Sequence, residues 1–428
     1  MGVCCSKDKP IYENFDKESL AEDDDACARA AEGGARVRLR GACAFASMFT
    51  QQGRKGVNQD AMTIWEGFAG DKERILCGVF DGHGPLGHKV AGHVRDVLPV
   101  KLASELKRSE SSDGHSDRDD TTEDTDDQED APSFDSWKEG FIKAFEGLDG
   151  DFGAGRAGFD CICSGTTAVI VVKQGEDLMV ANLGDSRAIL CTRDDKNRPV
   201  PVQLTVDLKP NLPREAERIE SCRGRVFALD EEPGVHRLWL PEDDSPGLAM
   251  ARAFGDFCLK DFGLIATPEV SHRKLTERDE FVVLATDGVW DVLSNREVAK
   301  IVASAGKKSD AARLLVERAV REWRCKHPTS KVDDCAVVCL DLKATAHKEE
   351  PRLLGQVSLS ESFKTARSED SEAAAGVHDE LKKDEWTALE GVSRVNSLLK
   401  LPRFGNVLSW RRRSVKEAEA EVEVGEVV

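Results

Sequence analysis

Several short apolar runs, each bounded by a glycine or an acidic turn, predict β-strands along this chain. These runs cover residues 75–80, 166–172, 178–183, 281–285 and 336–340. Between them, hydrophobic residues recur at helical spacing and predict α-helices, with Ser309 as the expected N-cap of the last helix. The helices are expected at residues 86–106, 137–148, 214–222, 296–303 and 311–323.

The order of these elements indicates the fold class. Strands and helices are mixed without strict alternation, which favours antiparallel sheets with helices outside over a doubly wound parallel sheet. Globular patterning covers residues 44–342, interrupted at about 108–135 by a polar acidic stretch that we interpret as a disordered insertion between two helices. Residues 1–43 are interpreted as a linker, and residues 343–428 as a charged tail.

The tail contains one apolar pattern. Hydrophobic residues recur at every third position from Trp386 to Leu398, and basic residues such as Arg403 and Arg411 surround them. This spacing predicts a short amphipathic helix. A membrane- or partner-binding helix and an ordinary packing helix or disordered tail remain equal alternatives.

The charge balance excludes one class of partner. The chain of 428 residues has a formal net charge of −19, and nucleic-acid binding requires a positive surface. Residues 109–130 hold eleven acidic residues against one basic residue, so this segment supplies −10 of the total and the rest only −9. No apolar run approaches the roughly eighteen residues of a transmembrane helix.

Thirteen cysteines are scattered along the chain. No two have the CxxC spacing, and neither the Cys161/Cys163 pair nor the Cys335/Cys339 pair fits a usual zinc pattern. We therefore expect reduced and mostly buried thiols in a cytosolic or nuclear protein.

The first six residues match the N-myristoylation pattern, with Gly2 second and Ser6 sixth. Cys4 and Cys5 follow at positions suited to S-palmitoylation, and a second acyl chain makes a membrane anchor stable. The sequence thus predicts attachment to the cytoplasmic face of a membrane, expected to be the plasma membrane, with a cytosolic or nuclear pool allowed. A chance match in a short disordered N-terminus is the alternative.

Carboxylates stand at the ends of the predicted strands. One such residue is usually a turn former, but the number of them in a single domain indicates a shared site. Oxygen ligands without a thiolate or histidine cluster suit Mg²⁺ or Mn²⁺, and two such ions can activate water and clamp a phosphoryl group. A di-metal phosphoesterase is the leading interpretation. The residues concerned are Asp60, Asp81, Asp185, Asp287, Asp291, Asp333 and Asp334.

Seven motifs in a fixed order make the sequence resemble the PPM (type 2C) family of metal-dependent protein serine/threonine phosphatases. The stretches at residues 204–211 and 245–264 resemble its plant-type branch, and the resemblance covers about residues 45–340. The motifs are Gly56-Val57-Asn58-Gln59-Asp60-Ala61, Phe80-Asp81-Gly82-His83-Gly84, Ser164-Gly165-Thr166-Thr167-Ala168, Leu183-Gly184-Asp185-Ser186-Arg187, residues 248–256, Ala285-Thr286-Asp287-Gly288-Val289-Trp290-Asp291 and Val332-Asp333-Asp334-Cys335-Ala336-Val337.

The resemblance implies an α+β fold, a four-layer αββα sandwich of two stacked, mainly antiparallel sheets flanked by helices. It also implies that Asp81 bridges two Mg²⁺ or Mn²⁺ ions and that the Gly82 carbonyl binds one of them. Asp287 and Asp333 would hold the first ion, and Asp60 would reach the cluster mostly through water. Two further aspartates match the site of a weaker third ion in some relatives. They are Asp185 and Asp291.

His83 matches the family's proposed general acid, because an imidazole titrates near neutral pH and can protonate the leaving oxygen. A hydrogen-bonded turn histidine is the alternative.

Two positions depart from the pattern of many relatives: Gln59 replaces a glutamate, and Lys55, beside Arg54, replaces an arginine that holds the substrate phosphate. Lys55 or Arg54 can supply the charge, although lysine lacks the bidentate fork of arginine.

The expected reaction is hydrolysis of phosphoserine or phosphothreonine in proteins by a metal-activated water, in a monomeric enzyme. Ser164 is interpreted as a strand residue in a tight turn, because the two-metal mechanism needs no covalent intermediate. The segment at residues 206–246 matches the family's flap beside the site. A catalytically inactive binding module with the same fold and a hydrolase of small phosphoesters are the rival interpretations.

Overall fold

Two six-stranded sheets, in which every strand pair is antiparallel, form the centre of the structure. The computed structural model describes residues 36–37, 41–43, 45–113, 133–343 and 398–399. The first sheet consists, in order, of β1 (Arg36–Val37), β4 (Ala61–Glu66), β5 (Arg74–Phe80), β8 (Ala168–Gln174), β9 (Asp177–Leu183) and β16 (Glu269–Lys274). The second consists of β11 (Pro199–Gln203), β10 (Arg187–Arg193), β17 (Asp279–Ala285), β18 (Cys335–Asp341), β3 (Ala46–Gln51) and β2 (Gly41–Ala42).

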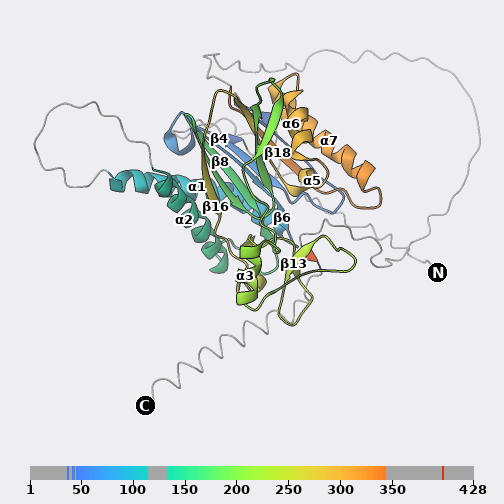
Figure 1. Ribbon diagram of the computed structural model, residues 1–428. Coiled ribbons are helices and arrows are strands. Elements are labelled where there is room, and N and C mark those ends of the chain that lie inside the picture. The colour runs from blue at the N-terminus through green and yellow to red at the C-terminus, as the bar shows by residue number, and fades with distance from the viewer. Residues whose placement is uncertain (1–35, 38–40, 44, 114–132, 344–397, 400–428) are drawn as a thin grey trace, which may run out of the picture.

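The two sheets pack face to face, with helices on both outer surfaces (Figure 1). Helices α1 (Gly87–Asp113) and α2 (Phe134–Gly153) cover the first sheet. Helices α6 (Asn295–Ala303) and α7 (Ala311–Lys326) cover the second. The expected four-layer αββα sandwich is therefore confirmed, and no helix in the described ranges has the length and apolar character needed to cross a membrane.

The central strands are apolar throughout because both of their faces are buried. In β5, Leu76 and Phe80 pack under the helices, whereas Ile75 and Val79 face the other sheet. Successive side chains of a strand point to opposite faces, so burial on both sides removes the polar positions. This explains why the sequence shows continuous apolar runs in place of an alternating pattern.

Two smaller sheets stand at the end of the sandwich that carries the loops. One contains β6 (Gly82–His83), β7 (Gly165–Thr166) and β15 (Phe254–Gly255). The other forms the flap, with β12 (Arg225–Ala228), β13 (His236–Trp239), β14 (Gly247–Leu248) and β19 (Leu398–Leu399). Helix α3 (Pro213–Ser221) packs beside the flap sheet, below the sandwich in Figure 1.

Several boundaries differ from the sequence prediction. The run at residues 166–172 is divided, because the Thr167 amide donates to the Asp81 carbonyl at 2.9 Å and leaves β7 in a separate sheet from β8. The expected N-cap Ser309 lies inside a 3-10 turn, Lys308–Asp310, so Asp310 precedes α7 in its place. Helix α1 continues to Asp113, into the segment interpreted as an insertion.

The ends of the domain also differ. Strands β1 and β2 pair with the main sheets, so the folded part begins inside the segment interpreted as a linker up to residue 43. In the tail, the prediction of a helix that includes Leu398 is wrong at this residue. Leu398 lies on strand β19, where it pairs with Leu248. The rest of the predicted amphipathic helix and the core of the acidic insertion lie outside the described residues.

We expect the buried ion pair in the flap to be a major source of its stability. Arg237 donates to Glu232 at 2.9 Å, and the two side chains are 1% and 4% exposed. Replacing Glu232 by alanine leaves a buried guanidinium without its carboxylate, a change that costs about 3–5 kcal/mol in comparable pairs. Denaturant unfolding and amide exchange in β12–β14 measure the loss.

The adjacent Glu231 provides the matched control, because it is exposed. We expect Glu231→Ala to change the free energy of unfolding by less than about 0.5 kcal/mol. Equal losses in the two variants would contradict a specific role for the pair.

Candidate active site

The predicted aspartates are brought to one end of the sandwich by strand register. Ala61 pairs with Phe80, which places Asp60 beside Asp81 at the end of the first sheet. Arg187 pairs with Ala285 in the second sheet, so the turn that carries Asp185 lies next to the short helix α5 (Asp287–Trp290). Asp333 directly precedes Asp334 and β18, the neighbour of β17.

The carboxylates in this cluster repel one another. Burial, together with the nearby charges of Asp287, Asp60 and Asp333, raises the pKa of Asp81 well above its ordinary value. Burial raises the pKa of Asp333 to about 7, against the opposing effect of Lys55. The same two causes, burial and neighbouring carboxylates, raise the pKa values of Asp60 and Asp287. When ionised, these carboxylates therefore place several negative charges close together.

Two lysines supply part of the missing positive charge. Lys55 donates to Asp333 at 2.7 Å, and although burial opposes its charge, Asp333 and Asp287 raise its pKa above the ordinary value. Lys209 forms an ion pair with Asp185, which is only 2% exposed. Arg54 is exposed, so of the two predicted phosphate-binding residues it is Lys55 that reaches the cluster.

The donor chemistry of the cluster fits a hard divalent cation, since every charged ligand is a carboxylate oxygen and Oδ1 of Asp185 is buried without a hydrogen-bond partner among the described residues. Within the same residues, no three His, Cys, Asp or Glu side chains converge closely enough to coordinate an ion by themselves. Carbonyl groups and water would complete a coordination shell, as is usual for Mg²⁺. Asp291, at the end of α5, is exposed.

Neighbouring groups hold the loops of the cluster in place. Asp334 accepts hydrogen bonds from the backbone N–H groups of Gly53 at 2.7 Å and Gln59 at 2.9 Å, which fixes the loop that carries Lys55. The Thr286 hydroxyl donates to Asp60 at 2.8 Å. The Gln59 side chain donates to the carbonyl of Gly84 at 2.8 Å. Gln59, the position that departs from many relatives, thus stabilises a turn.

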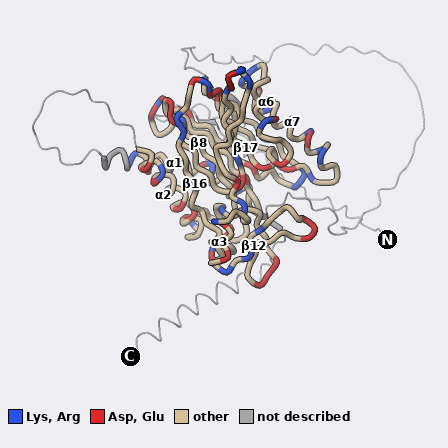
Figure 2. Tube along the Cα trace, in the orientation of Figure 1, with Lys and Arg blue, Asp and Glu red and all other residues tan. Residues whose placement is uncertain are grey.

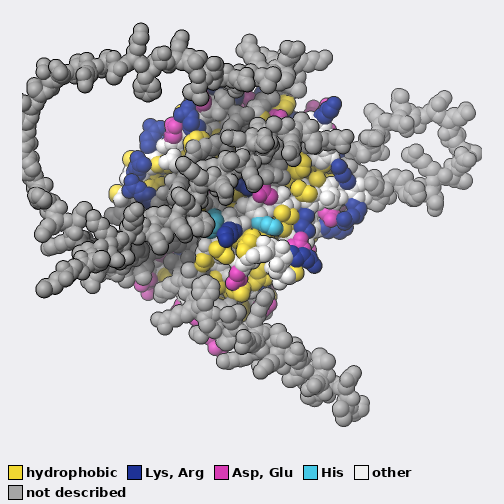
Figure 3. All heavy atoms as spheres, turned by 180° about the vertical axis from the view of Figure 1, so that it is seen from behind, with side chains coloured by type: hydrophobic (Ala, Val, Ile, Leu, Met, Phe, Trp, Pro, Cys, Tyr) yellow, Lys and Arg dark blue, Asp and Glu magenta, His cyan; other side chains and the backbone are white. Residues whose placement is uncertain are grey.

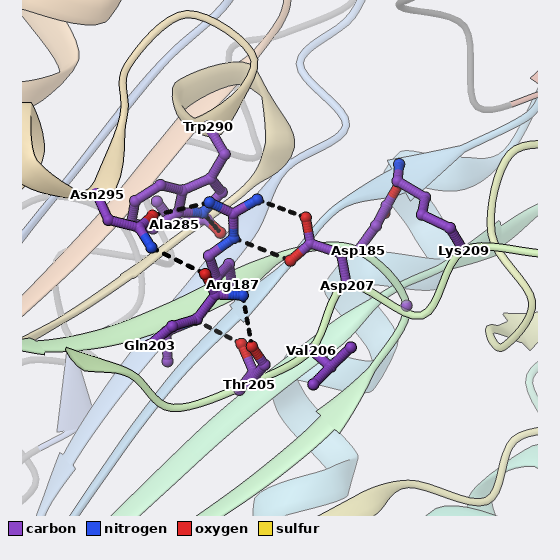
Figure 4. Close-up of polar contacts among 12 residues, drawn as sticks. Asp185, Arg187, Gln203, Thr205, Val206, Asp207, Lys209, Ala285, Trp290 and Asn295 are labelled. Carbon is purple, nitrogen blue, oxygen red and sulfur yellow. Dashed lines mark hydrogen bonds and ion pairs between the residues drawn. The ribbon is translucent and has the colours of Figure 1, made fainter. Parts of the chain in front are cut away.

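Arg187 links the Asp185 turn to helix α5. Its guanidinium donates to both carboxylate oxygens of Asp207, at 2.9 and 2.5 Å, and to Asn295 at 2.8 Å. It also stacks over the ring of Trp290, 5.0 Å from the ring centroid. Figure 4 shows Arg187 between these partners, with Lys209 and Asp185 beside them. A bidentate arginine of this kind sets orientation as well as distance. Arg187 therefore fixes Asp207, at the start of the flap segment, relative to helix α5, which begins at Asp287.

His83 lies on β6, two residues after Asp81, in the small sheet of β6, β7 and β15. Its side chain is 4% exposed, and Nε2 lies 2.5 Å from Oδ2 of the fully buried Asp256. Nδ1 is buried and has no hydrogen-bond partner among the described residues. The Asp256 carboxylate therefore fixes the ring and leaves Nδ1 as the unbound nitrogen.

Gly165 makes this pairing possible. A Cβ atom at this position would lie 2.1 Å from Oδ2 of Asp256 and 2.7 Å from Nε2 of His83. Only glycine allows β7 to approach the pair so closely. The Ser164 hydroxyl accepts from the Leu86 N–H at 2.9 Å, which agrees with its predicted role in a turn.

Three residues of the site belong to the sequence motifs although the sequence indicates no role for them. Lys209 belongs to the stretch at residues 204–211, Asp256 ends the stretch at residues 248–256, and Arg187 follows the Asp185 turn. Motif membership was the only available signal, because their partners lie far away in the sequence. The predicted acylation residues Gly2, Cys4 and Cys5 lie outside the described residues.

We expect the cation-free protein to become less stable as the pH rises from about 4 to about 7. The usual pKa of Asp333 is 3.8, and its folded-state pKa is about 7. Within this window the folded state binds a proton that the unfolded state has lost, so stability falls with increasing pH. Thermal unfolding in excess chelator at several pH values measures this slope.

The Asp333→Asn variant isolates the contribution of this group. It should flatten the pH dependence between pH 5 and pH 7 relative to the unchanged protein. Identical slopes for the two proteins would show that Asp333 ionises normally in the folded chain.

The described surface shows charges of both signs. Lysine, arginine and acidic residues are interspersed along the outer helices, while acidic residues mark the loops beside β12 (Figure 2). From behind, the uncovered part of the surface mixes basic, hydrophobic and acidic side chains (Figure 3).

Comparisons with known proteins agree with this architecture. The family model described as "Protein phosphatase 2C" matches residues 46–327. A rice protein, "Probable protein phosphatase 2C 73", is 55% identical over 431 residues, which covers 98% of each chain. An Arabidopsis thaliana protein, "Probable protein phosphatase 2C 33", is 49% identical, with 86% of this chain and 88% of that protein covered.

A solved structure is similar in fold. The serine-threonine phosphatase 2C from Toxoplasma gondii superposes with a TM-score of 0.61 at 22% identity, covering 72% of this chain and 99% of that chain. At this identity the likeness concerns the arrangement of sheets and helices.

Proposed function

Because this chain belongs to the protein phosphatase 2C family and is a metal-dependent protein serine/threonine phosphatase of its plant-type branch, we propose that its carboxylate cluster holds two divalent cations. The observation that carries this proposal is the charge imbalance of the cluster: burial and repulsion raise the pKa values of Asp81 and Asp287, and the two lysines offset only part of the charge. Bound Mg²⁺ or Mn²⁺ would balance the remaining negative charge of the carboxylates.

Bound cations would lower the pKa of a water molecule and stabilise the charge of the phosphoryl oxygens. Asp81 and the Gly82 carbonyl, with Asp287 and Asp333, are the proposed ligands of the pair, and Asp60 supports them through water. Asp185 and Asp291 are proposed for a weaker third ion. Lys209, which pairs with Asp185, would then have to move when that ion binds.

The chain's own residues would handle the substrate. Lys55 extends from a loop that Asp334 fixes, so its ammonium group can hold a phosphate oxygen at a defined place. His83 would donate a proton to the leaving serine or threonine oxygen while Asp256 holds its ring through Nε2. The substrates are phosphorylated proteins, and the flap, which stands beside the Asp185 turn, would contact the residues around the phosphate.

The direct test is phosphate release from a phosphothreonine peptide by the full chain. It is run with Mn²⁺, with Mg²⁺ and with chelator, beside the same assay on a small phosphoester. We expect release that depends on either cation and stops in chelator. Release that continues in chelator, or hydrolysis of the small ester alone, would contradict the proposal.

We also propose that acylation at the N-terminus attaches the protein to the cytoplasmic face of a membrane, where its substrates would be membrane-associated phosphoproteins. Support comes from Gly2 and Ser6 in the myristoylation pattern and from Cys4 and Cys5 beside them. Gly2→Ala should move the protein to the soluble fraction, because stable anchoring takes two lipid signals and this variant lacks the myristoyl chain. Membrane fractionation of cells that express the two forms measures this.

Ser6→Thr is the matched control, since threonine also fits the pattern and should leave the distribution unchanged. Membrane attachment that survives Gly2→Ala would show that another part of the chain supplies the contact.

A further inference from the structure

Two cysteines outside the carboxylate cluster lie in contact across the fold. The sulfur atoms of Cys163 and Cys258, 95 positions apart in the chain, are 3.5 Å from each other. Both side chains are partly exposed, whereas cysteines of the central strands such as Cys77 and Cys335 are buried. Cys163 precedes β7, and Cys258 lies on the short helix α4 (Phe257–Lys260).

We propose that Cys163 and Cys258 form a reversible disulfide when the protein meets a peroxide, and that this disulfide lowers phosphatase activity by displacing the His83–Asp256 pair. The effect on activity rests on the role proposed above for His83; formation of the bond does not.

The two segments are already held side by side. The backbone N–H of Cys258 donates to the carbonyl of Ile162 at 3.0 Å, and that of Asp256 donates to Ser164 at 3.0 Å. A disulfide requires the sulfur atoms to approach to about 2.0 Å, roughly 1.5 Å closer than they are. This closure needs a small movement of α4 or of the loop before β7, and no unfolding.

The reaction balances with a peroxide as the oxidant. The Cys163 thiolate attacks one oxygen of the peroxide, the O–O bond breaks, and the leaving oxygen takes a proton to give water or an alcohol. The sulfur of Cys258 then attacks the sulfenic sulfur of Cys163, the S–O bond breaks, and the hydroxide leaves with the thiol proton as water. Two thiols are oxidised by two electrons in total, and a thiol reductant reverses the change.

The disulfide does not depend on which sulfur reacts first. The hydrogen bond with Cys163, burial and the nearby charge of Asp256 raise the pKa of the Cys258 thiol far above its ordinary value, which disfavours its thiolate. The same bond results if Cys258 is oxidised first and Cys163 attacks it.

The disulfide would affect the His83–Asp256 pair because Gly165 packs against both residues without free space between them. Asp256 stands two residues before Cys258, and Gly165 two residues after Cys163. Gly165 lies so close to both members of the pair that even a Cβ atom does not fit between them. A movement of α4 or of the loop before β7 that brings the two sulfurs together would therefore shift Asp256 relative to His83, and a misplacement of about 1 Å can cost on the order of 10²-fold in rate.

The test begins with disulfide mapping of the full chain, treated with hydrogen peroxide and then alkylated. Cleavage after Arg252 and Lys260 releases Cys258 as the single cysteine of its peptide. We expect this peptide linked to the one that contains Cys161 and Cys163, with fragmentation assigning the bond to Cys163. Peroxide oxidation of the exposed Cys325 without any such link, or oxidation of Cys163 to sulfinic acid without it, would overturn the proposal.

Activity of the same samples tests the consequence. We expect peroxide to lower it about 10-fold to 10²-fold, with recovery in dithiothreitol and no loss in Cys163→Ser. Cys325→Ser, which removes an exposed cysteine on α7, should respond like the unchanged protein. A linked peptide without loss of activity would overturn the proposed effect on His83. An equal loss of activity in peroxide-treated Cys163→Ser would show that the disulfide does not cause the loss. Mapping remains decisive even if the protein hydrolyses no phosphopeptide.

Discussion

Replacing Asp287 by asparagine is expected to lower metal-dependent hydrolysis of a phosphothreonine peptide on the order of 10³-fold or more, since loss of even one neutral donor to a developing charge costs about 10²–10³-fold. Asp287 interacts electrostatically with Asp81, Asp185, Lys55 and Lys209, so its carboxylate lies at the centre of the cluster. Asparagine keeps the shape and one oxygen ligand but removes the charge. Steady-state kinetics across a range of Mn²⁺ concentrations measure the loss.

Thermal unfolding separates this effect from a folding defect. In chelator, Asp287→Asn should be at least as stable as the unchanged protein, because it removes one of several repelling carboxylates. With Mn²⁺ it should gain less stability. The exposed Asp195 supplies the control: Asp195→Asn should leave activity and metal stabilisation unchanged. Full activity of Asp287→Asn at moderate Mn²⁺ would show that the cluster is not the catalytic centre.

Replacing His83 by glutamine is expected to have the second-largest effect, and one that depends on the leaving group. A general acid contributes about 10²–10⁴-fold when the leaving oxygen needs a proton. Threonine is such a leaving group, whereas p-nitrophenolate departs without one. His83→Gln should therefore reduce hydrolysis of a phosphothreonine peptide strongly and hydrolysis of p-nitrophenyl phosphate much less. Parallel kcat measurements on the two substrates give the comparison.

His93 offers a matched control, because it is a histidine on α1 that packs against Phe152, with 5.2 Å between the ring centroids. His93→Gln should affect both substrates little and equally. An equal, large loss on both substrates in His83→Gln would indicate that His83 serves only to pack the β6–β7 turn, as its burial and its bond to Asp256 also allow.

The sequence located most of the elements because hydrophobic patterning is a local signal. The apolar run at residues 178–183 became β9, Asp177–Leu183, and the helical spacing at residues 311–323 became part of α7, Ala311–Lys326. The errors arose where a distant contact decides the local conformation. Thr167 leaves its strand to bond Asp81, and Leu398 joins the flap sheet through Leu248. Hydrophobic patterning along the chain does not predict either of these contacts.

By itself, the sequence determined the family, the fold class and the acidic residues of the cluster, because each depends on residue type and order along the chain. Only the tertiary structure decided which groups share space. It placed Lys55 on Asp333 and left Arg54 exposed, and it paired His83 with Asp256 across 173 positions. It also brought Cys163 to Cys258. Charge compensation and thiol chemistry act over a few ångströms, and such distances are set by packing between sheets and loops that are remote in sequence.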